Sequence, residues 1–189
     1  MADVVLIGDS IRMGYEAVVR RELTGIDVWT SEQNGGDSRR VRENIAAWAT
    51  VHHPKVVHVN CGLHDLKKDF ETGTPAVPLE EYRDNVTALL SELTKLDATI
   101  IWALTTPVNE KWHHETKGFD RFEADVVAYN EVAKEICLAS DVTINDLYAV
   151  VMKAGRDHVL KPDGVHFGEA GCELLGKAVA ECVRKVLSV

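Results

Sequence analysis

The sequence predicts a three-layer α/β/α sandwich around a five-stranded parallel β-sheet. Two features of the apolar pattern carry this prediction. Short uninterrupted apolar runs rich in β-branched residues recur along the chain, and such runs are typical of strands buried on both faces of a parallel sheet. Between them, apolar residues recur with the period of a helix. Strand and helix alternate about five times, which implies right-handed crossovers and helices on both faces of the sheet.

Each predicted element follows from its own segment. The predicted strands are Val4–Ile7, Val28–Thr30, Val56–Asn60, Thr99–Thr105 and Val142–Ile144. The helical stripes are Val41, Ile45 and Trp48; Leu79, Tyr82, Val86, Leu89, Leu93 and Leu96; Phe122, Val126, Tyr129, Ala133 and Ile136; and Leu175, Val179, Cys182 and Val186. Two segments show neither pattern and are expected to be loops, Lys67–Val77 and Pro107–Asp120.

Residues 1–189 are expected to form one domain. The composition is ordinary for a globular protein, with 46% apolar and 27% charged residues, and no repeat or Ser/Gly-rich linker interrupts it. A chain of this length buries roughly 70% of its unfolded surface, so a core needs neither metal nor disulfide. No apolar stretch approaches the ~20 residues that cross a bilayer, so no membrane span is expected.

Charge and cysteine content narrow the partners and the compartment. The net charge is -9, and the one dense basic run, Arg39, Arg40 and Arg42, is better explained as the exposed face of a helix start. Nucleic acid is therefore not expected as a partner. The start of the chain lacks the basic and apolar regions of a signal peptide, and the four cysteines are scattered. We expect reduced cysteines and a cytoplasmic location.

Polar blocks follow the predicted strands, where parallel α/β sheets bind their ligands. The first three are Gly8-Asp9-Ser10, Asn34-Gly35-Gly36-Asp37-Ser38 and Gly62-Leu63-His64-Asp65; a fourth, Asp163-Gly164-Val165-His166, stands late in the chain. With the strand order 2-1-3-4-5, the first three blocks become neighbours. A hydroxyl, glycine N–H groups and an imidazole would then converge on one place.

The four blocks, in this order, resemble those of the SGNH (GDSL) hydrolase family of serine esterases and lipases. The resemblance spans Gly8 to His166 and implies a flavodoxin-like sheet of SGNH type. It assigns Ser10 as the nucleophile, His166 as the general base and Asp163 as the acid that orients it. The chemistry agrees, because a serine hydroxyl needs an adjacent base, and a carboxylate fixes the tautomer of a histidine.

The resemblance also implies an oxyanion hole. The Ser10 N–H and the Gly36 N–H are the implied backbone donors, with Gly35 as the alternative glycine. The third family block reads Gly-x-Asn-Asp, whereas this chain has His64 in place of the asparagine. Losing one such donor costs about 2.7–4 kcal/mol, but an imidazole N–H can also donate. We hypothesise that His64 replaces the asparagine, either as a neutral or as a protonated donor.

For several other residues a structural role is expected rather than a catalytic one. Ser38, in the second Gly-Asp-Ser, is expected to lie at a helix cap rather than to act as a nucleophile. Asp65, Cys61 and His58 are expected to be structural. Trp112 and His113, in the loop after the fourth strand, are candidates for lining a substrate pocket. Adjacent histidines on a loop point in different directions, so no metal site is expected.

The sequence thus predicts a carboxylic ester hydrolase that works through an acyl-serine intermediate and needs no cofactor. A short acyl group, such as acetyl, on a carbohydrate or small polar alcohol is the favoured substrate, because 189 residues leave little room for a lid or a long acyl groove. The alternatives are a long-chain lipase or thioesterase, an acyltransferase on the same triad, and a weakly catalytic binding protein. The sequence does not predict the oligomeric state.

Overall fold

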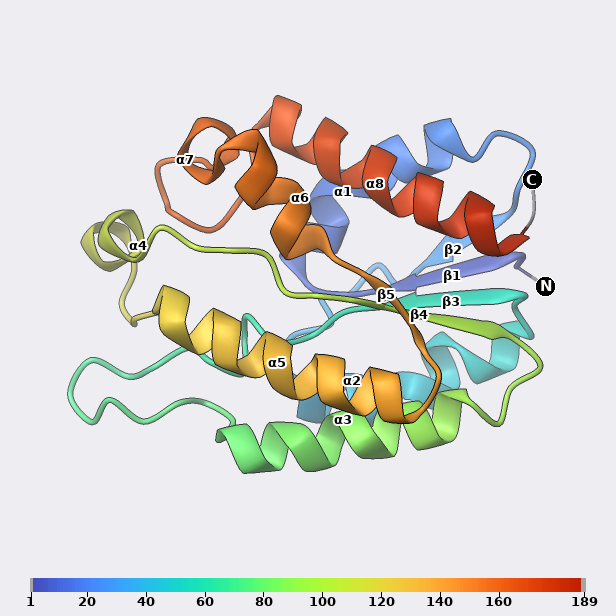
Figure 1. The fold of residues 1–189 in the computed structure, drawn as a ribbon, viewed down its shortest axis with the longest axis horizontal. Helices are drawn as coiled ribbons and strands as arrows, with labels where there is room; N and C mark the ends of the chain where they lie inside the picture. The colour runs from blue at the N-terminus through green and yellow to red at the C-terminus, as the bar shows by residue number, and fades with distance from the viewer. Residues whose placement is uncertain (1, 188–189) are drawn as a thin grey trace.

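A computed structural model describes residues 2–187 and shows one five-stranded sheet (Figure 1). All neighbouring strands are parallel and their order is β2-β1-β3-β4-β5, as predicted. The strands are β1 (Val4–Ile7), β2 (Val28–Thr30), β3 (Val56–Val59), β4 (Thr99–Ala103) and β5 (Thr143–Asn145). β1 lies between β2 and β3, so the reversal of strand order falls beside the end of β1, where a ligand site is expected.

Helices cover both faces of the sheet, which confirms the three-layer prediction. The α-helices are α1 (Ser10–Glu22), α2 (Ser38–Trp48), α3 (Leu79–Leu93), α4 (Glu110–Thr116), α5 (Glu123–Ala139), α6 (Leu147–Ala154), α7 (Arg156–Val159) and α8 (Glu169–Leu187), with a short 3₁₀ turn, η1 (Thr50–His52). Helices α1, α6 and α8 lie on one face, and α2, α3 and α5 lie on the other (Figure 1). α4 and α7 lie beyond the carboxyl ends of the strands.

The segment predicted as the loop Pro107–Asp120 contains α4, so that prediction is wrong for its middle part. The helix has only seven residues, too few for a periodic apolar stripe to be recognised. Its start is fixed by the Asn109 side chain, which accepts a hydrogen bond from the Trp112 N–H (3.1 Å). The short helices α6 and α7 were not predicted, for the same reason.

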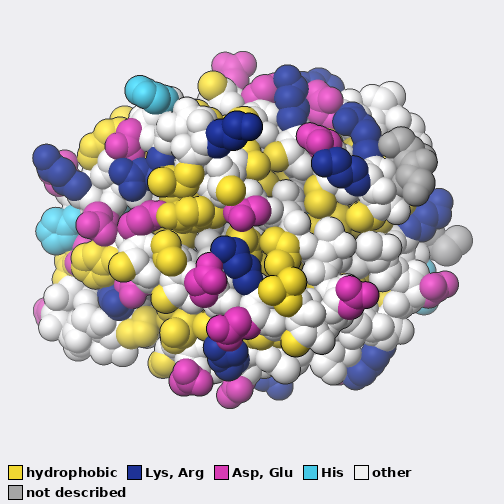
Figure 2. Space-filling view, viewed as in Figure 1, with side chains coloured by type: hydrophobic (Ala, Val, Ile, Leu, Met, Phe, Trp, Pro, Cys, Tyr) yellow, Lys and Arg dark blue, Asp and Glu magenta, His cyan; other side chains and the backbone are white. Residues whose placement is uncertain are grey.

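The core consists of the strands and the inward faces of the long helices. β1 and β3 are buried along their whole length, as parallel central strands should be. On the face seen in Figure 2, acidic and basic side chains are interspersed rather than gathered by sign. Within residues 2–187, no helix combines the length and apolarity that a bilayer crossing requires.

Candidate active site

The first strand delivers Ser10 to the carboxyl edge of the sheet. β1 ends at Ile7, and the chain turns through Gly8 and Asp9 into α1. The Asp9 carboxylate accepts a hydrogen bond from the Ile11 N–H (2.9 Å) and caps the helix. Ser10 is therefore the first residue of α1, and it is half-buried. The free N–H groups of a helix start favour negative charge at this position.

Ser10, His166 and Asp163 form a continuous chain of hydrogen bonds. The Ser10 Oγ lies 2.9 Å from Nε2 of His166. Nδ1 of the same ring lies 2.6 Å from Oδ2 of Asp163. When Nδ1–H donates to a carboxylate, Nε2 is left as an acceptor for a serine proton. The structure thus brings together three residues from the two ends of the sequence in a geometry that can activate a hydroxyl.

The surroundings of Asp163 keep its carboxylate ionised. Oδ1 accepts hydrogen bonds from the N–H groups of Val165 (3.1 Å) and His166 (2.9 Å), and Nζ of Lys117 lies 3.3 Å from Oδ2. Burial alone would raise the pKa of Asp163, but the hydrogen bonds from His166 and Val165 outweigh it and hold the pKa well below its usual value. An ionised Asp163 can stabilise an imidazolium on His166.

The turn Asp163–His166 is anchored on both sides. A β-bridge joins Leu160 to Phe167 across its base. On the other side, the Asn109 N–H donates to the Gly164 carbonyl (2.8 Å). Gly164 has φ +71°, and a Cβ there would lie 2.4 Å from the Asn109 carbonyl oxygen. Only glycine allows α4 to approach the turn this closely.

The second block lies against the nucleophile loop, but its glycine N–H groups are engaged. The Gly35 N–H donates to the Gly8 carbonyl (3.0 Å). The Gly36 N–H, predicted as an oxyanion donor, donates instead to Oδ1 of Asn34 (2.8 Å). The sequence predicts a free Gly36 N–H, whereas in the structure this N–H is occupied by Asn34. The Asn34 side chain must turn away before this N–H can serve a ligand.

The second Gly-Asp-Ser is structural, which confirms the prediction. Asp37 caps α2 by accepting a hydrogen bond from the Arg40 N–H (3.0 Å). Ser38 is fully buried, and its N–H donates to both carboxylate oxygens of Asp65 (2.9 and 3.1 Å). Its Oγ accepts a hydrogen bond from Nδ2 of Asn85 (3.0 Å). Ser38 is thus shielded from any substrate, and Asp65 serves as a buried structural carboxylate.

His64 is half-buried on the loop after β3. Burial lowers the pKa of His64; nearby Asp9 opposes this effect, and nearby Arg121 adds to it. The imidazole is therefore neutral at neutral pH, which disfavours the protonated form of the hypothesis. No group within residues 2–187 forms a hydrogen bond with the ring, so it can donate to a ligand.

Cys61 is fully buried, and burial raises the pKa of its thiol well above the usual value, so it stays protonated.

Neither Trp112 nor His113, the residues suggested by the sequence, lines the open pocket beside Ser10 and His166. Trp112 is half-buried, but His113 is fully buried and cannot line an open pocket. The Nε2 of His113 instead lies 3.1 Å from Nη1 of Arg121, whose Nε donates to the Leu63 carbonyl (2.6 Å). Sequence reasoning missed Arg121, because no spacing or motif marks it; its place beside the third block arises only from the fold.

An open pocket of about 270 Å³ adjoins Ser10 and His166. Its other lining residues are Ile11, Gly14, Lys161, Phe167, Glu169 and Cys172. This volume lies just below the roughly 300–1,000 Å³ of typical ligand sites.

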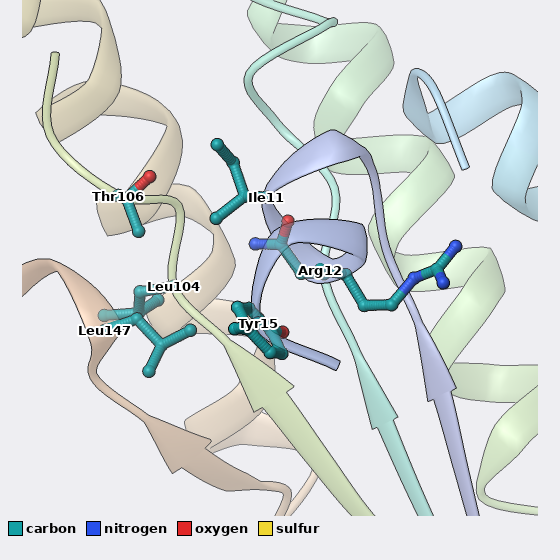
Figure 3. Close-up of a pocket in the computed structure, with 7 residues that line it drawn as sticks. Ile11, Arg12, Tyr15, Leu104, Thr106 and Leu147 are labelled. Atoms are coloured by element: carbon teal, nitrogen blue, oxygen red, sulfur yellow. The ribbon is translucent and has the colours of Figure 1, made fainter. Parts of the chain in front are cut away.

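A separate cavity of about 10 Å³, lined in part by Tyr15, Leu104 and Thr106, lies beneath the start of α1 (Figure 3). It has room for about one water molecule and belongs to the interior, not to a substrate site.

No set of three or more His, Cys, Asp and Glu side chains in the described part of the chain is arranged to hold a metal ion. The site is characterised by the hydrogen-bonded series Ser10, His166 and Asp163. A model of the GDSL-like lipase/acylhydrolase family matches residues 6–174. The chain belongs to this family. It is accordingly a hydrolase, and the family resemblance seen in the four sequence blocks is confirmed.

Solved structures show the same fold over nearly the whole chain. A lipase/acylhydrolase from Enterococcus faecalis has a TM-score of 0.83 at 22% identity, covering 98% of this chain and 96% of its own. The acetyl xylan esterase AlAXEase has a TM-score of 0.77 at 17% identity, with 95% and 99% coverage. A catalytic mutant of Axe2, an acetylxylan esterase from Geobacillus stearothermophilus, has a TM-score of 0.79 at 17% identity, with 96% and 94% coverage. No curated protein sequence matches this GDSL-like chain.

Proposed function

We propose that this GDSL-like hydrolase cleaves carboxylic esters through an acyl-enzyme on Ser10. The observation that supports the proposal most directly is the hydrogen-bonded series Ser10–His166–Asp163, with distances of 2.9 and 2.6 Å. Family membership supports the reaction class, because the family comprises lipases and acylhydrolases. No residue outside this series is needed to generate the nucleophile.

The reaction has two stages. Nε2 of His166 accepts the Ser10 proton as Oγ attacks the ester carbonyl carbon, and a tetrahedral oxyanion forms. Its collapse breaks the bond to the alcohol oxygen, which receives the proton from His166 and leaves. Water then attacks the acyl-serine, giving its proton to His166. Collapse of the second tetrahedral intermediate releases the acid and returns the proton to Ser10. Asp163 stays ionised and stabilises the imidazolium in both stages.

The oxyanion needs donors close to Ser10. The Ser10 N–H has no acceptor within residues 2–187, and it lies at the start of α1, where the helix dipole adds to its effect. The neutral His64 ring supplies a second N–H in place of the family asparagine. The third donor is the Gly36 N–H, once Asn34 has released it. This exchange of Asn34 for an oxyanion replaces one acceptor by a more negative one.

The preferred substrate is a short-acyl ester, such as an acetyl ester, of a carbohydrate or another small polar alcohol. The pocket of about 270 Å³ beside Ser10 is small, which disfavours a long acyl chain. Lys161 and Glu169 give its lining charged groups that suit a polar ligand. Two structural neighbours of the chain are acetyl xylan esterases, which is consistent with this substrate class.

The proposal predicts that Ser10→Ala abolishes hydrolysis of 4-nitrophenyl acetate at pH 7.5. Removing the nucleophile of such a triad lowers kcat by at least about 10⁴-fold. Release of 4-nitrophenol by wild type and variant is the measurement. Ser91→Ala, on the exposed side of α3, is the matched control and should retain wild-type rates. Equal turnover by Ser10→Ala and wild type would refute the assignment of the nucleophile.

The acyl-length preference is measured with the 4-nitrophenyl series from acetate to decanoate. We expect kcat/KM to be highest for acetate and to fall beyond butyrate. A maximum at octanoate or longer would contradict the short-acyl proposal while leaving the role of Ser10 intact. Acetylated sugars, assayed by acetate release, then test the alcohol.

A further inference from the structure

Arg121 is a buried cation without a carboxylate partner. Only 5% of its surface is exposed. Its Nε donates to the Leu63 carbonyl, and its Nη1 donates to Nε2 of His113, which is neutral because burial lowers the pKa of His113 to about 4. Among the residues that the structure describes, no carboxylate oxygen lies within 4 Å of this guanidinium. Arg12, another deeply buried arginine, is by contrast paired with Glu16.

The guanidinium keeps its charge and has one nitrogen to spare. Burial lowers the pKa of Arg121 to about 10, opposed by the more distant carboxylates of Asp9 and Asp163, so the group is charged at neutral pH. Nη2 has no hydrogen-bond partner within residues 2–187, and it is not sealed from solvent. Burying a charge without a partner is unfavourable, and a bound anion would relieve this cost.

The fold holds Arg121 beside the third block of the candidate active site. The N–H and carbonyl groups of Lys68 and Asp120 are joined by two hydrogen bonds of 2.8 Å, which tie the loop after β3 to the segment before α5. This pairing places Arg121 against Leu63, the residue before His64. Arg121 also interacts electrostatically with Asp9 and Asp163. The guanidinium therefore lies within electrostatic reach of both the nucleophile loop and the triad acid.

A second cation faces the same aromatic ring. Nζ of Lys67 lies 5.6 Å from the centroid of Phe119, and Cζ of Arg121 lies 5.0 Å from it. Lys67, like Arg121, has no carboxylate within 4 Å in the described structure, whereas Lys117 is paired with Asp163. Two unpaired cations thus gather beside the site in a chain whose net charge is -9. The overall charge would repel an anion that this local cluster attracts.

We propose that Arg121, assisted by Lys67, binds an anionic group of the substrate, so that the preferred esters carry a carboxylate or similar charge near the scissile bond. The inference rests on the proposed ester hydrolysis and specifies its substrate class. The charge can belong to either the alcohol or the acyl part. A guanidinium suits this task because its planar fork matches the oxygens of a carboxylate.

Paired probes separate the two sources of charge. On the alcohol side, 4-acetoxyphenylacetate is compared with its methyl ester. In both probes a methylene group separates the carboxyl group from the ring, so the leaving phenols have similar reactivity. On the acyl side, mono-4-nitrophenyl adipate is compared with its methyl ester. In at least one pair we expect wild-type kcat/KM to be roughly 10- to 100-fold higher for the anion, the effect of one charged hydrogen bond. The preference should shrink as salt is added.

Three variants show whether Arg121 causes the preference. Arg121→Gln should remove it while leaving the neutral probe within a fewfold of wild type, and Arg121→Lys should retain part of it. Arg83→Gln, at a partly exposed position on α3 that pairs with Glu135, makes the same change in net charge away from the site and should change nothing. Thermal melts establish that each variant is folded; if Arg121→Gln does not fold, Arg121→Lys and Lys67→Gln carry the comparison.

The outcomes distinguish the two proposals. If neutral probes are hydrolysed in a Ser10-dependent manner but neither anionic probe is preferred, the anion site is refuted and the esterase remains. Equal losses on charged and neutral probes in Arg121→Gln would also refute it, because they indicate a purely structural arginine. If Ser10→Ala matches wild type on every probe, the proposed function itself fails.

Discussion

At the scale of single residues, His64 is the position where this chain departs from its family pattern. The side chain is half-buried, and burial lowers its pKa, so the ring is neutral at neutral pH. A neutral imidazole carries one N–H, which is all that an oxyanion donor requires. Charge on His64 is therefore unnecessary for the proposed role, and this predicts how the activity depends on pH.

The neutral donor predicts that activity does not decline between pH 7 and 9. His64→Ala should lower kcat for 4-nitrophenyl acetate by roughly 10²–10³-fold, because one oxyanion donor is lost. His64→Asn, which restores a side-chain N–H and the family residue, should retain most of the activity. The measurement is the pH–rate profile of all three proteins. A fall in wild-type rate above pH 7 that is absent in His64→Asn would instead show that the charged imidazole is needed.

Some of these residues can be predicted from the sequence and others cannot. Ser10, Asp163 and His166 belong to motifs whose residue types and spacing indicate their roles, and the structure brings them within hydrogen-bond distance. Arg121 belongs to no such motif. It stands out only in the structure, because it is buried and has no carboxylate nearby. The engagement of the Gly36 N–H by Asn34 is likewise a matter of side-chain conformation, which composition and spacing do not report.

At the scale of elements, α4 supports the turn that carries two of the triad residues. Gly164 in this turn has positive φ, and an added Cβ would approach the Asn109 carbonyl to 2.4 Å and the His113 N–H to 2.7 Å. Helix and turn are thus packed backbone to backbone. The position of the Asp163 carboxylate relative to Ser10 depends on this contact, which no local propensity of either segment predicts.

Gly164→Ala should therefore lower both stability and activity. The strained backbone alone costs roughly 1–3 kcal/mol, and the clash must move either α4 or the turn. Gly73→Ala is the matched control, since Gly73 has φ +64° with no atom within 4 Å of its Cβ position. Urea unfolding and 4-nitrophenyl acetate turnover are measured for both. If Gly73→Ala loses as much activity as Gly164→Ala, the close packing of α4 is not what positions Asp163.

The predictability of the elements follows from their length and burial. All five strands were recognised because each is a continuous apolar run, and α2, α3, α5 and α8 because their stripes repeat over several turns, whereas no stripe was assigned to α1. Helices α4, α6 and α7, of seven, eight and four residues, are too short for such periodicity. α4 is capped by Asn109, and asparagine is also common in turns, so the sequence alone did not separate helix from loop.

At the scale of the whole molecule, a buried carboxylate joins three parts of the fold. Asp65 follows β3, accepts hydrogen bonds from the Ser38 N–H at the start of α2, and through Ser38 is linked to Asn85 of α3. The same loop carries His64, and α2 begins directly after the Gly36 loop. The core therefore contains an ionisable group at the junction that supports two blocks of the site.

This arrangement predicts a global stability that depends on Asp65. Burial raises the pKa of Asp65 to about 7, despite the hydrogen bonds from Ser38. Since an unfolded aspartate titrates near 3.9, the native state binds the extra proton between about pH 4 and 7. The stability associated with that proton is fully present below pH 4 and is lost as the pH rises through 7. This direction is opposite to that expected from the low pKa of Asp163, whose contribution is lost in acid.

Asp65→Asn separates this contribution from all others, because the amide oxygen can still accept the Ser38 N–H while the charge is gone. Between pH 5 and pH 8, the free energy of unfolding of the variant minus that of wild type should rise by on the order of 2–3 kcal/mol. The reason is that only wild type must ionise a buried group over this range. Unfolding by urea at both pH values is the measurement. Asp84→Asn, exposed on α3, removes the same charge and should show no such gain. A stability difference between Asp65→Asn and wild type that stays constant over this range would mean that Asp65 ionises in the fold as it does in the unfolded chain, and the junction would then not respond to pH.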